Sequence, residues 1–389
     1  MADPHAQHLQ WTEQGQPRQA LWQADNGARL PTRVQVCDAL DPAGAHRLAS
    51  AGTGLLWRGP YPSARQLLQG MSERMDAAAT RQRHKAPQSP LDAGQAFAAY
   101  RQAQGLRARV LGQLLIEIDG QYRIGLPRAP QVHQACTEAW GPPDGQPRVI
   151  ALRALLGLIG AHEWRKAGVP IDALGGARIH PHHGVFSPVR GEYLDLIAQA
   201  PLPKALSGCP LAIDVGVGTG VLSALLLRRG VPRVLATDLS ARAIACADDN
   251  LQRLGLRDRA ELIQTDLYPP GQAALVVCNP PWLPGQPNSP LDQAIFDPDS
   301  AMLRGFLNHL RPHLCEGGEG WLVMSDLAER LGLRTRQQLL GWIEQTGLRV
   351  IERHDTRPRH PKASDTHDPL HAARAAEVTS LWRLGVAPI

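Results

Sequence analysis

The sequence predicts an α/β fold for the second half of the chain, in which a parallel sheet carries helices on both faces. Short apolar runs alternate with helical stretches from about residue 172, which is the pattern of βαβ units. A glycine-rich loop follows the first run, and an acidic residue stands at or just past the end of each of the next two. The runs are residues 211–215, 233–237, 260–264, 273–278, 319–325 and 348–353, and a last run at 378–384 could be added antiparallel.

The chain is long enough for two domains and has an ordinary globular composition, with 389 residues, 43% hydrophobic and 20% charged. Its net charge of +5 permits contact with nucleic acid or the ribosome without requiring it. The six cysteines are scattered and offer no zinc knuckle or dithiol. No apolar stretch approaches the roughly 18 residues of a membrane span, and the N-terminus lacks a signal pattern. We expect a cytoplasmic protein with reduced thiols and no membrane segment.

Residues 1–171 are predicted to form a mainly helical N-terminal domain that recognises the substrate. Helical patterns cover residues 43–56, 63–79, 93–105 and 149–166, and the polar stretch near 81–90 is predicted to be a loop. Apolar residues alternate around Asp119-Gly120 over residues 115–124, which is typical of a β-hairpin. Helices with a hairpin are consistent with a winged-helix-like unit, and a plain helical cap is the simpler alternative. Residues 172–389 are predicted to form the second domain.

The glycine loop joins the first strand of that domain to a helix. It contains Gly216, Gly218 and Gly220, which let the backbone turn tightly and approach a ligand without side chains in the way. The spacing is G-x-G-x-G rather than the G-x-G-x-x-G of a dinucleotide site, because Val221 stands where the third glycine would be. The loop therefore favours a nucleoside that lacks phosphates.

Three carboxylates accompany this loop at the strand ends. Asp214 belongs to the first strand, Asp238 ends the second, and Asp266 follows the third. Asp238 is placed to accept hydrogen bonds from two ribose hydroxyls, and Asp266 could accept one from an adenine amine. A single such residue is more often a helix cap or turn residue. Three of them in consecutive βα units favour the ligand site.

A second motif, Asn279-Pro280-Pro281-Trp282, follows the fourth apolar run. The two prolines stiffen the loop and present the Asn279 amide oxygen and the Pro280 carbonyl. Two fixed acceptors can hold the hydrogens of a planar NH₂ group and turn its lone pair toward an electrophilic methyl group. Trp282 can stack on such a planar group. A proline-rich turn that only closes a strand is the alternative.

These two motifs together resemble the class I S-adenosylmethionine-dependent methyltransferases over about residues 180–389. The resemblance implies a Rossmann-like seven-stranded sheet with an antiparallel last strand, and S-adenosyl-L-methionine as cofactor. The tetrapeptide is similar to the N-P-P-[aromatic] signature of amino-group methyltransferases. Those enzymes act on adenine N6 of DNA, guanine N2 of rRNA, or glutamine side chains of release factors and ribosomal proteins. Tyr or Phe is the usual aromatic residue, so Trp282 leaves the acceptor class open.

The segment 183–192, His-Gly-Val-Phe-Ser-Pro-Val-Arg-Gly-Glu, is similar to the leading segment of the glutamine and rRNA small-domain methyltransferases. The resemblance implies that Phe186 and Pro188 contact the methionine end of the cofactor. Core packing is an equally good interpretation of both residues. The match is loose, because Val189 separates Pro188 from Arg190.

Two histidine-containing regions remain. His180, His182 and His183 have no cysteine or carboxylate at ligand spacing, so surface or hairpin positions are favoured over a metal site. The basic loop 355–376 would overhang the acceptor site if the sixth strand is parallel, where it could contact phosphate or the ribosome; a solvated loop is the alternative. Its basic residues are Arg357, Arg359, His360, Lys362, His367 and His371.

The sequence thus predicts an N-methyltransferase with a planar NH₂ acceptor. The acceptor is a glutamine side chain of a translation protein or an exocyclic amine of an rRNA base. A DNA N6-adenine methyltransferase and a non-catalytic protein that binds S-adenosylmethionine or RNA are the alternatives. The expected partners are a ribosomal protein, a release factor or rRNA, with no metal and no membrane.

Overall fold

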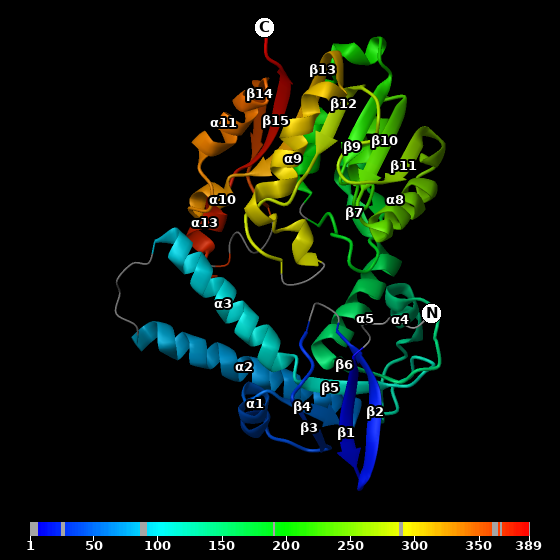
Figure 1. Cartoon of the computed structure of the whole chain (residues 1–389), viewed down its shortest axis with the longest axis vertical. Coiled ribbons are helices and arrows are strands. Elements are labelled where there is room, and N and C mark those ends of the chain that lie inside the picture. The colour runs from blue at the N-terminus through cyan, green and yellow to red at the C-terminus, as the bar shows by residue number, and fades with distance from the viewer. Residues whose placement is uncertain are drawn as a thin grey trace. The chain divides into compact units, whose positions relative to one another are not determined.

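The structure is a computed structural model that describes residues 7–24, 28–85, 92–189, 191–287, 291–359, 365 and 368–388. The chain divides into two compact units, whose elements are labelled in Figure 1. Unit 1 comprises Met1–Leu91 and Ala98–Glu163, and unit 2 comprises Asp92–Phe97 and Trp164–Ile389. The domain assignment with its boundary after residue 171 stays a prediction.

Unit 1 is built on a mixed sheet of six strands in the order β1-β2-β6-β5-β4-β3. The pairs β1·β2 and β5·β6 are antiparallel, and the other neighbours are parallel. Its elements are β1 (His8–Glu13), β2 (Gln16–Gln23), β3 (Arg33–Cys37), α1 (Pro42–Ser50), β4 (Thr53–Trp57), α2 (Tyr61–Lys85), α3 (Ala93–Leu111), β5 (Leu114–Ile118), α4 (His133–Trp140), β6 (Arg148–Ala151) and α5 (Leu152–Ala167).

The six-stranded sheet of unit 1 was not expected from the sequence, although the helices of unit 1 contain more residues than its strands. The predicted helix over residues 43–56 is wrong in its last part, since Gly52 at φ +84° ends the turn and Thr53–Trp57 forms β4. The predicted hairpin over 115–124 is wrong too, because β5 pairs with β6 and β4 instead. Short apolar runs fit buried strands and helices equally well, so sequence periodicity could not separate them. The hairpin that the winged-helix-like alternative requires is therefore not formed by residues 115–124. Helix α2 continues to Lys85, and residues 86–90 of the predicted loop lie outside the described residues.

Unit 2 contains a seven-stranded sheet in the order β11-β10-β9-β12-β13-β15-β14, with β15 antiparallel to both neighbours. The topology agrees with the sheet that the sequence resemblance implies. Its elements are β7 (Val169–Ile171), β8 (Ala177–Ile179), α6 (Glu192–Gln199), β9 (Leu211–Val215), α7 (Val221–Arg228), β10 (Arg233–Asp238), α8 (Ala241–Arg253), β11 (Ala260–Gln264), β12 (Ala273–Cys278), α9 (Ala301–Leu310), β13 (Leu314–Ser325), α10 (Leu327–Arg330), α11 (Arg336–Gln345), β14 (Leu348–Thr356), α13 (His371–Ala375) and β15 (Thr379–Val386).

Strand β12 shows why this sheet needs helices on both faces. All six of its residues are buried. Leu275 and Val277 pack in the cluster that includes residues of α6, α7 and α8, whereas Val276 and Cys278 pack in the cluster with α9 and α11. Successive side chains of a strand point to opposite faces, so an unbroken apolar run is the sequence of a strand covered on both sides.

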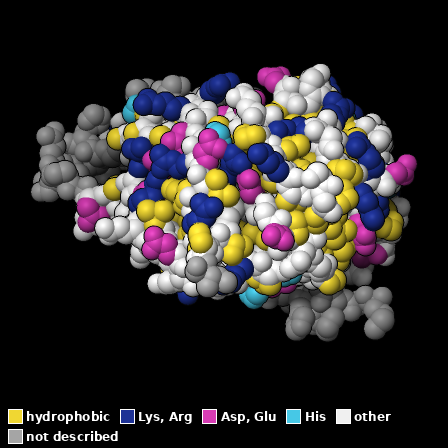
Figure 2. All heavy atoms as spheres, turned by 90° about the horizontal axis from the view of Figure 1, so that it is seen from above, with side chains coloured by type: hydrophobic (Ala, Val, Ile, Leu, Met, Phe, Trp, Pro, Cys, Tyr) yellow, Lys and Arg dark blue, Asp and Glu magenta, His cyan; other side chains and the backbone are white. Residues whose placement is uncertain are grey.

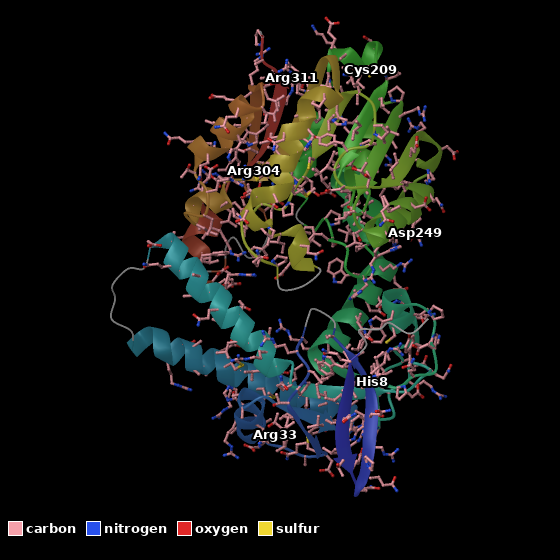
Figure 3. The ribbon with its side chains drawn as sticks, viewed as in Figure 1. His8, Arg33, Cys209, Asp249, Arg304 and Arg311 are labelled. Carbon is pink, nitrogen blue, oxygen red and sulfur yellow. The ribbon has the colours of Figure 1, made fainter. Side chains whose placement is uncertain are left out.

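The surface and the cysteines add little constraint on function. Figure 2 shows acidic and basic side chains intermixed over the face that it displays. None of the described helices is both long enough and apolar enough to cross a bilayer. All six cysteines are free, but the fold brings Cys209 and Cys315 into contact although they are far apart in sequence. Figure 3 shows Cys209 just before β9.

Candidate active site

The carboxyl ends of three parallel strands bring the sequence motifs together. In the sheet, Val215 at the end of β9 pairs with Thr237 of β10 on one side and with Cys278 of β12 on the other. Gly216, Asp238 and Asn279 each follow one of these paired residues, so they lie at the same edge. Figure 1 shows β9, β10 and β12 as neighbours. Ligands of open α/β sheets bind at this edge.

The glycine loop is held against β10 by its own backbone. The N–H groups of Gly216 and Val217 both donate to the carbonyl oxygen of Thr237, at 2.9 and 2.8 Å. Gly216 has φ +78°, and a Cβ there would lie 2.9 Å from Cε of Met302. Gly220 has φ +80° and faces the backbone of Ala247. Only glycine fits these two positions without strain.

Asp238 lies beside the loop and accepts two backbone hydrogen bonds. Its Oδ2 accepts from the N–H of Gly218 at 3.1 Å, and its Oδ1 accepts from Ser240 at 2.9 Å. Burial raises the pKa of this carboxyl, and the two hydrogen bonds oppose that effect. The next residue, Leu239, is 70% exposed although it is apolar. Sequence reasoning missed Leu239; an apolar residue directly after a strand-end carboxylate is the signal that could have found it.

Asp214 is completely buried beneath the loop. Its Oδ2 accepts hydrogen bonds from the N–H and the hydroxyl of Ser223, at 3.0 and 2.6 Å. Its Oδ1 has no hydrogen-bond partner among the described residues. Burial raises the pKa of this carboxyl to about 6, with a contribution from the nearby Asp238 charge. An acceptor left unsatisfied in this way favours a positively charged ligand group close by.

Asp266 occupies a more open position. It is exposed, two residues past the end of β11. The N–H of Thr265 donates to the carbonyl oxygen of Asp238 at 3.1 Å, which ties the ends of β10 and β11 together. The three carboxylates predicted from the sequence thus lie at the ends of three adjacent strands.

Asn279 is held by two aromatic side chains. The indole Nε1 of Trp282 donates to its Oδ1 at 2.9 Å. The hydroxyl of Tyr193, on α6, forms a second hydrogen bond with the Asn279 side chain. Burial raises the pKa of the Tyr193 hydroxyl, and this hydrogen bond acts in the opposite direction, as expected if the amide N–H donates to the hydroxyl oxygen. Trp282 is half-buried and packs against both hydrophobic clusters of unit 2. Sequence reasoning missed Tyr193.

Part of the chain matches a known protein family. Residues 176–333 match the protein-family model described as Methyltransferase small domain. These residues form a methyltransferase domain. The domain spans the glycine loop, the three carboxylates and the tetrapeptide, and the methyl donor of this class of domain is S-adenosyl-L-methionine.

Two curated relatives each match about a third of the chain. The chain is 33% identical over 120 residues to the ribosomal protein L11 methyltransferase of Tolumonas auensis, which is 30% of this chain and 41% of that protein. It is 28% identical over 163 residues to the release factor glutamine methyltransferase of Rhodopirellula baltica, which is 38% of this chain and 55% of that protein. The chain thus spans about half the length of these relatives. A solved L11 methylase from Lactobacillus delbrueckii matches with 18% identity and a TM-score of 0.32, covering 46% of this chain and 70% of that one.

The loop after the tetrapeptide is tied to α9 of the methyltransferase domain. The N–H of Leu283 donates to the carbonyl oxygen of Ile295 at 3.0 Å, and the N–H of Asp297 donates to the carbonyl oxygen of Leu283 at 2.9 Å. The carboxylate of Asp297 then accepts from the N–H groups of Met302 and Leu303, at 2.9 and 3.1 Å. One acidic residue therefore both closes the loop and caps the helix. Residues 288–290 of the loop lie outside the described residues.

Arg334 is a buried cation that sequence reasoning also missed. It follows α10 and is 3% exposed. Its Nε and Nη2 have no hydrogen-bond partner among the described residues. Burial lowers the pKa of this guanidinium, while the charges of Glu329 and Asp297 act to raise it. No motif marks this position, because its burial depends on how the turn after α10 packs.

The leading segment of the methyltransferase domain is partly exposed. Phe186 is 39% exposed, so it is not a core residue, whereas Pro188 is buried. Arg190 lies outside the described residues. The contacts of Phe186 and Pro188 with the cofactor stay a prediction.

The nearby histidines are occupied by protein groups. Nδ1 of His180 lies 2.7 Å from the carbonyl oxygen of Arg165, and Nε2 of His182 lies 3.2 Å from the carboxylate of Asp249 on α8, which is labelled in Figure 3. His183 contacts Arg242. Within the described residues, no group of three or more metal-binding side chains comes together.

The basic loop 355–376 is only partly described, since His360, Lys362 and His367 lie outside the described residues. Arg359 is 3.5 Å from Asp195, and Arg374 pairs with Asp368 at 2.9 Å. Part of the positive charge of this loop is therefore balanced within unit 2, and its contact with phosphate stays a prediction.

Proposed function

We propose that this protein transfers a methyl group from S-adenosyl-L-methionine to a planar NH₂ group. The observation that supports this most directly is the pairing of Cys278 with Val215. Because β9 and β12 are adjacent and parallel, the tetrapeptide that begins at Asn279 starts beside the glycine loop that begins at Gly216. A site for a nucleoside and a site for a planar amine thus share one edge of the sheet.

The cofactor site is proposed to consist of the glycine loop and the strand-end carboxylates. Asp238 would accept hydrogen bonds from the ribose, and the exposed Leu239 would cover the adenine ring. Asp266 would accept from the adenine amine, and the buried Asp214 would attract the ammonium group of the methionine portion. Phe186 and Pro188 are also proposed to contact this portion. The unsatisfied Oδ1 of Asp214 supports the fit, because it lacks a donor within the described residues.

The acceptor is proposed to be held by oxygen atoms of the tetrapeptide. The cofactor supplies an electrophilic methyl group on a sulfonium. The Asn279 Oδ1 already accepts from Trp282, and a carbonyl oxygen has a second lone pair that can accept from the substrate. The Pro280 carbonyl would accept the other N–H, and Pro281 keeps the loop stiff. These two contacts orient the nitrogen lone pair and stabilise the positive charge that develops there, so no strong base is needed before the methyl arrives.

We favour a glutamine side chain of a translation protein as the acceptor. The curated relatives are named release factor glutamine methyltransferases and ribosomal protein L11 methyltransferase, so a release factor or ribosomal protein in the cytoplasm is the proposed partner. An exocyclic amine of rRNA remains the alternative acceptor, with nucleic acid contact in that case. A DNA N6-adenine acceptor and a non-catalytic role are less favoured, because the relatives are named as enzymes of translation proteins.

A labelling experiment tests the proposal and separates its alternatives. Purified full-length protein and S-adenosylmethionine with a radiolabelled methyl group are added to a lysate from cells that lack the protein. We expect label that is sensitive to protease and resistant to nuclease. Label lost to ribonuclease would assign an rRNA acceptor, and label lost to deoxyribonuclease would assign DNA. Cofactor binding by calorimetry without transfer to any fraction would contradict an enzymatic role.

A further inference from the structure

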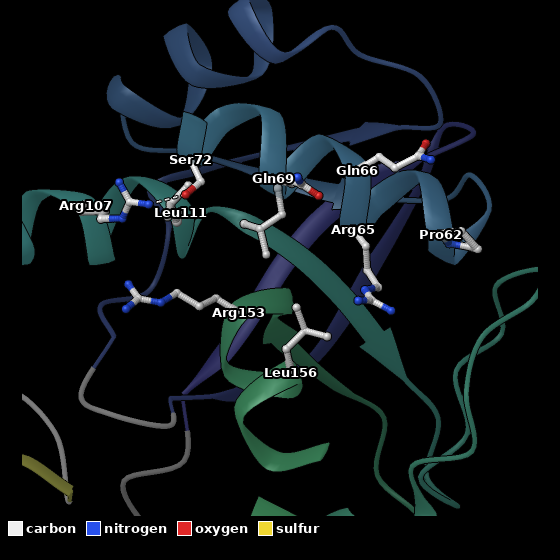
Figure 4. A pocket seen from close by; sticks show the side chains of 10 residues that line it. Pro62, Arg65, Gln66, Gln69, Ser72, Arg107, Leu111, Arg153 and Leu156 are labelled. Carbon is white, nitrogen blue, oxygen red and sulfur yellow. Dashed lines mark hydrogen bonds between the residues drawn. The ribbon is translucent and has the colours of Figure 1, made fainter. Parts of the chain in front are cut away.

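Unit 1 contains a cavity that the proposed methyl transfer does not use. It has a volume of about 620 Å³, within the range of roughly 300–1,000 Å³ that is typical of small-molecule pockets. Helices α2, α3 and α5 line it, and all the lining residues belong to unit 1. Figure 4 shows the cavity from close by.

Three arginines line the cavity, one from each helix, and no acidic residue does. Arg65 comes from α2, Arg107 from α3 and Arg153 from α5. Figure 4 shows Arg153 extending toward the side of the cavity where Arg107 lies. Burial and the nearby charge of Arg107 both lower the pKa of Arg153, which agrees with this proximity. The like charges of Arg107 and Arg153 repel each other unless an anion lies between them.

The positive charge of the cavity is only partly balanced by protein groups. Arg107 donates to both carboxylate oxygens of Asp76 and to the hydroxyl of Ser72. Neither Arg65 nor Arg153 has a hydrogen bond or ion pair with any residue that the structure describes. Two guanidinium groups therefore remain available to a ligand, and guanidinium groups bind phosphate oxygens with paired N–H donors.

The rest of the lining is mixed, with Pro62 and three leucines beside Gln66, Gln69 and Ser72. Leu68, Leu111 and Leu156 come from the same three helices, and Leu111 is almost fully buried. An apolar wall beside cationic side chains suits a ligand that has a flat organic part and a phosphate group.

We propose that this cavity binds a nucleotide, with its phosphate at Arg153 on the side of Arg107, its base against the leucines, and Arg65 on the opposite side of the cavity. The nucleotide is either free or a unit of an RNA chain. In the second case unit 1 would anchor RNA independently of the methyltransferase domain. The proposal does not depend on methyl transfer, because it rests on residues of unit 1 alone.

The proposal is tested with the full-length protein and two probes, a short fluorescent oligouridylate and AMP. We expect the oligouridylate to bind, and Arg153→Glu and Arg65→Glu each to weaken binding by about tenfold or more, because each replaces a cation that faces the ligand by an anion. Arg109→Glu is the matched control, since Arg109 lies on α3 and is exposed but does not line the cavity. It should change binding by less than about threefold through the general electrostatic field.

The two probes identify the source of the nucleotide. Competition by AMP at the same site supports binding of a free nucleotide, and binding of the oligouridylate without competition by AMP supports recognition of the RNA chain. The proposal is overturned if neither probe binds the wild-type protein, or if Arg109→Glu weakens binding as much as Arg153→Glu. Because neither Arg65 nor Arg153 has a hydrogen bond or ion pair with the described residues, their variants should melt at the wild-type temperature, and two separate variants guard against misfolding of one.

Discussion

The indole Nε1 of Trp282 donates a hydrogen bond of 2.9 Å to Oδ1 of Asn279. This contact fixes which end of the amide is oxygen, and it leaves the amide N–H groups on the side of Tyr193. Tyr or Phe at the position of Trp282 would have no ring N–H to donate in this way. In this protein Trp282 therefore orients the side chain of Asn279.

Replacing the indole by a phenyl ring should separate orientation from stacking. We expect Trp282→Phe to lower kcat by about tenfold, since one hydrogen bond that orients Asn279 is lost while an aromatic ring remains. The dissociation constant for S-adenosylmethionine should not change. Steady-state kinetics and calorimetry check both values. Trp164→Phe, at a half-exposed position on α5, is the control. Unchanged kcat in Trp282→Phe would show that this hydrogen bond does not matter for the reaction.

Removing the Asn279 amide should abolish transfer and spare cofactor binding. We expect Asn279→Ala to reduce kcat by about 100-fold or more, comparable to the loss of one donor or acceptor that acts on the reacting group. The control is Asn308→Ala at an exposed position of α9. Methyl transfer and calorimetry are measured side by side. If S-adenosylmethionine binding is lost as well, Asn279 has a structural role instead.

Neutralising Asp238 should act on the cofactor. We expect Asp238→Asn to weaken S-adenosylmethionine binding by about 10- to 100-fold, because hydrogen bonds to a charged oxygen become hydrogen bonds to a neutral one. Asp258→Asn is an exposed control near the start of β11. Calorimetric titration gives the two constants. Equal affinities in both variants would argue against a ribose contact at Asp238.

The raised pKa of Asp214 predicts a specific pH dependence. With a folded-state pKa of about 6 against an ordinary value of 3.8, the folded protein holds this proton more tightly than the unfolded chain does. The free energy of unfolding without cofactor should therefore fall, by up to about 3 kcal/mol, as the pH rises from about 4 to about 6. Asp214→Asn should remove this slope. Denaturant unfolding at several pH values measures it, and an identical slope in the variant would contradict the assignment.

A methyl group at Gly216 should disturb the loop and α9 together. Gly216 has φ +78°, and the new Cβ would lie 2.9 Å from Cε of Met302. We expect Gly216→Ala to cost about 1–3 kcal/mol of stability and to weaken cofactor binding. Gly157→Ala is the opposite control, because an added Cβ at this position in α5 meets nothing within 4 Å, and it should be neutral or slightly stabilising. Thermal melts of both variants decide the matter.

Much of the candidate site could be predicted because its residues follow apolar strands directly. Asp238 and Asn279 each stand at the tip of a buried run, and parallel neighbours put such tips at one edge. Tyr193 could not be found in this way, since its contact with Asn279 depends on how α6 packs on the sheet. Arg334 was equally hidden, because no sequence motif marks this buried arginine.

The sheet of unit 1 was missed for a related reason. Strands such as β4 and β5 are short and almost wholly buried, so they lack the polar alternation that distinguishes a strand from a helix. The pairing that makes them strands joins distant segments, as when β2 pairs with β6. The arginine cavity likewise depends on three helices that meet only in the folded unit.

Asp297 connects the loop after the tetrapeptide with the helix that lies beside the cofactor loop. Its backbone binds Leu283, next to the tetrapeptide, and its carboxylate caps α9, whose Met302 lies against Gly216 of the cofactor loop. We expect a ligand that orders either end of this connection to order the other end as well, so that the second ligand binds to a partly organised site. Such coupling is reciprocal. If the bound cofactor raises the affinity for the acceptor by some factor, the bound acceptor must raise the affinity for the cofactor by the same factor.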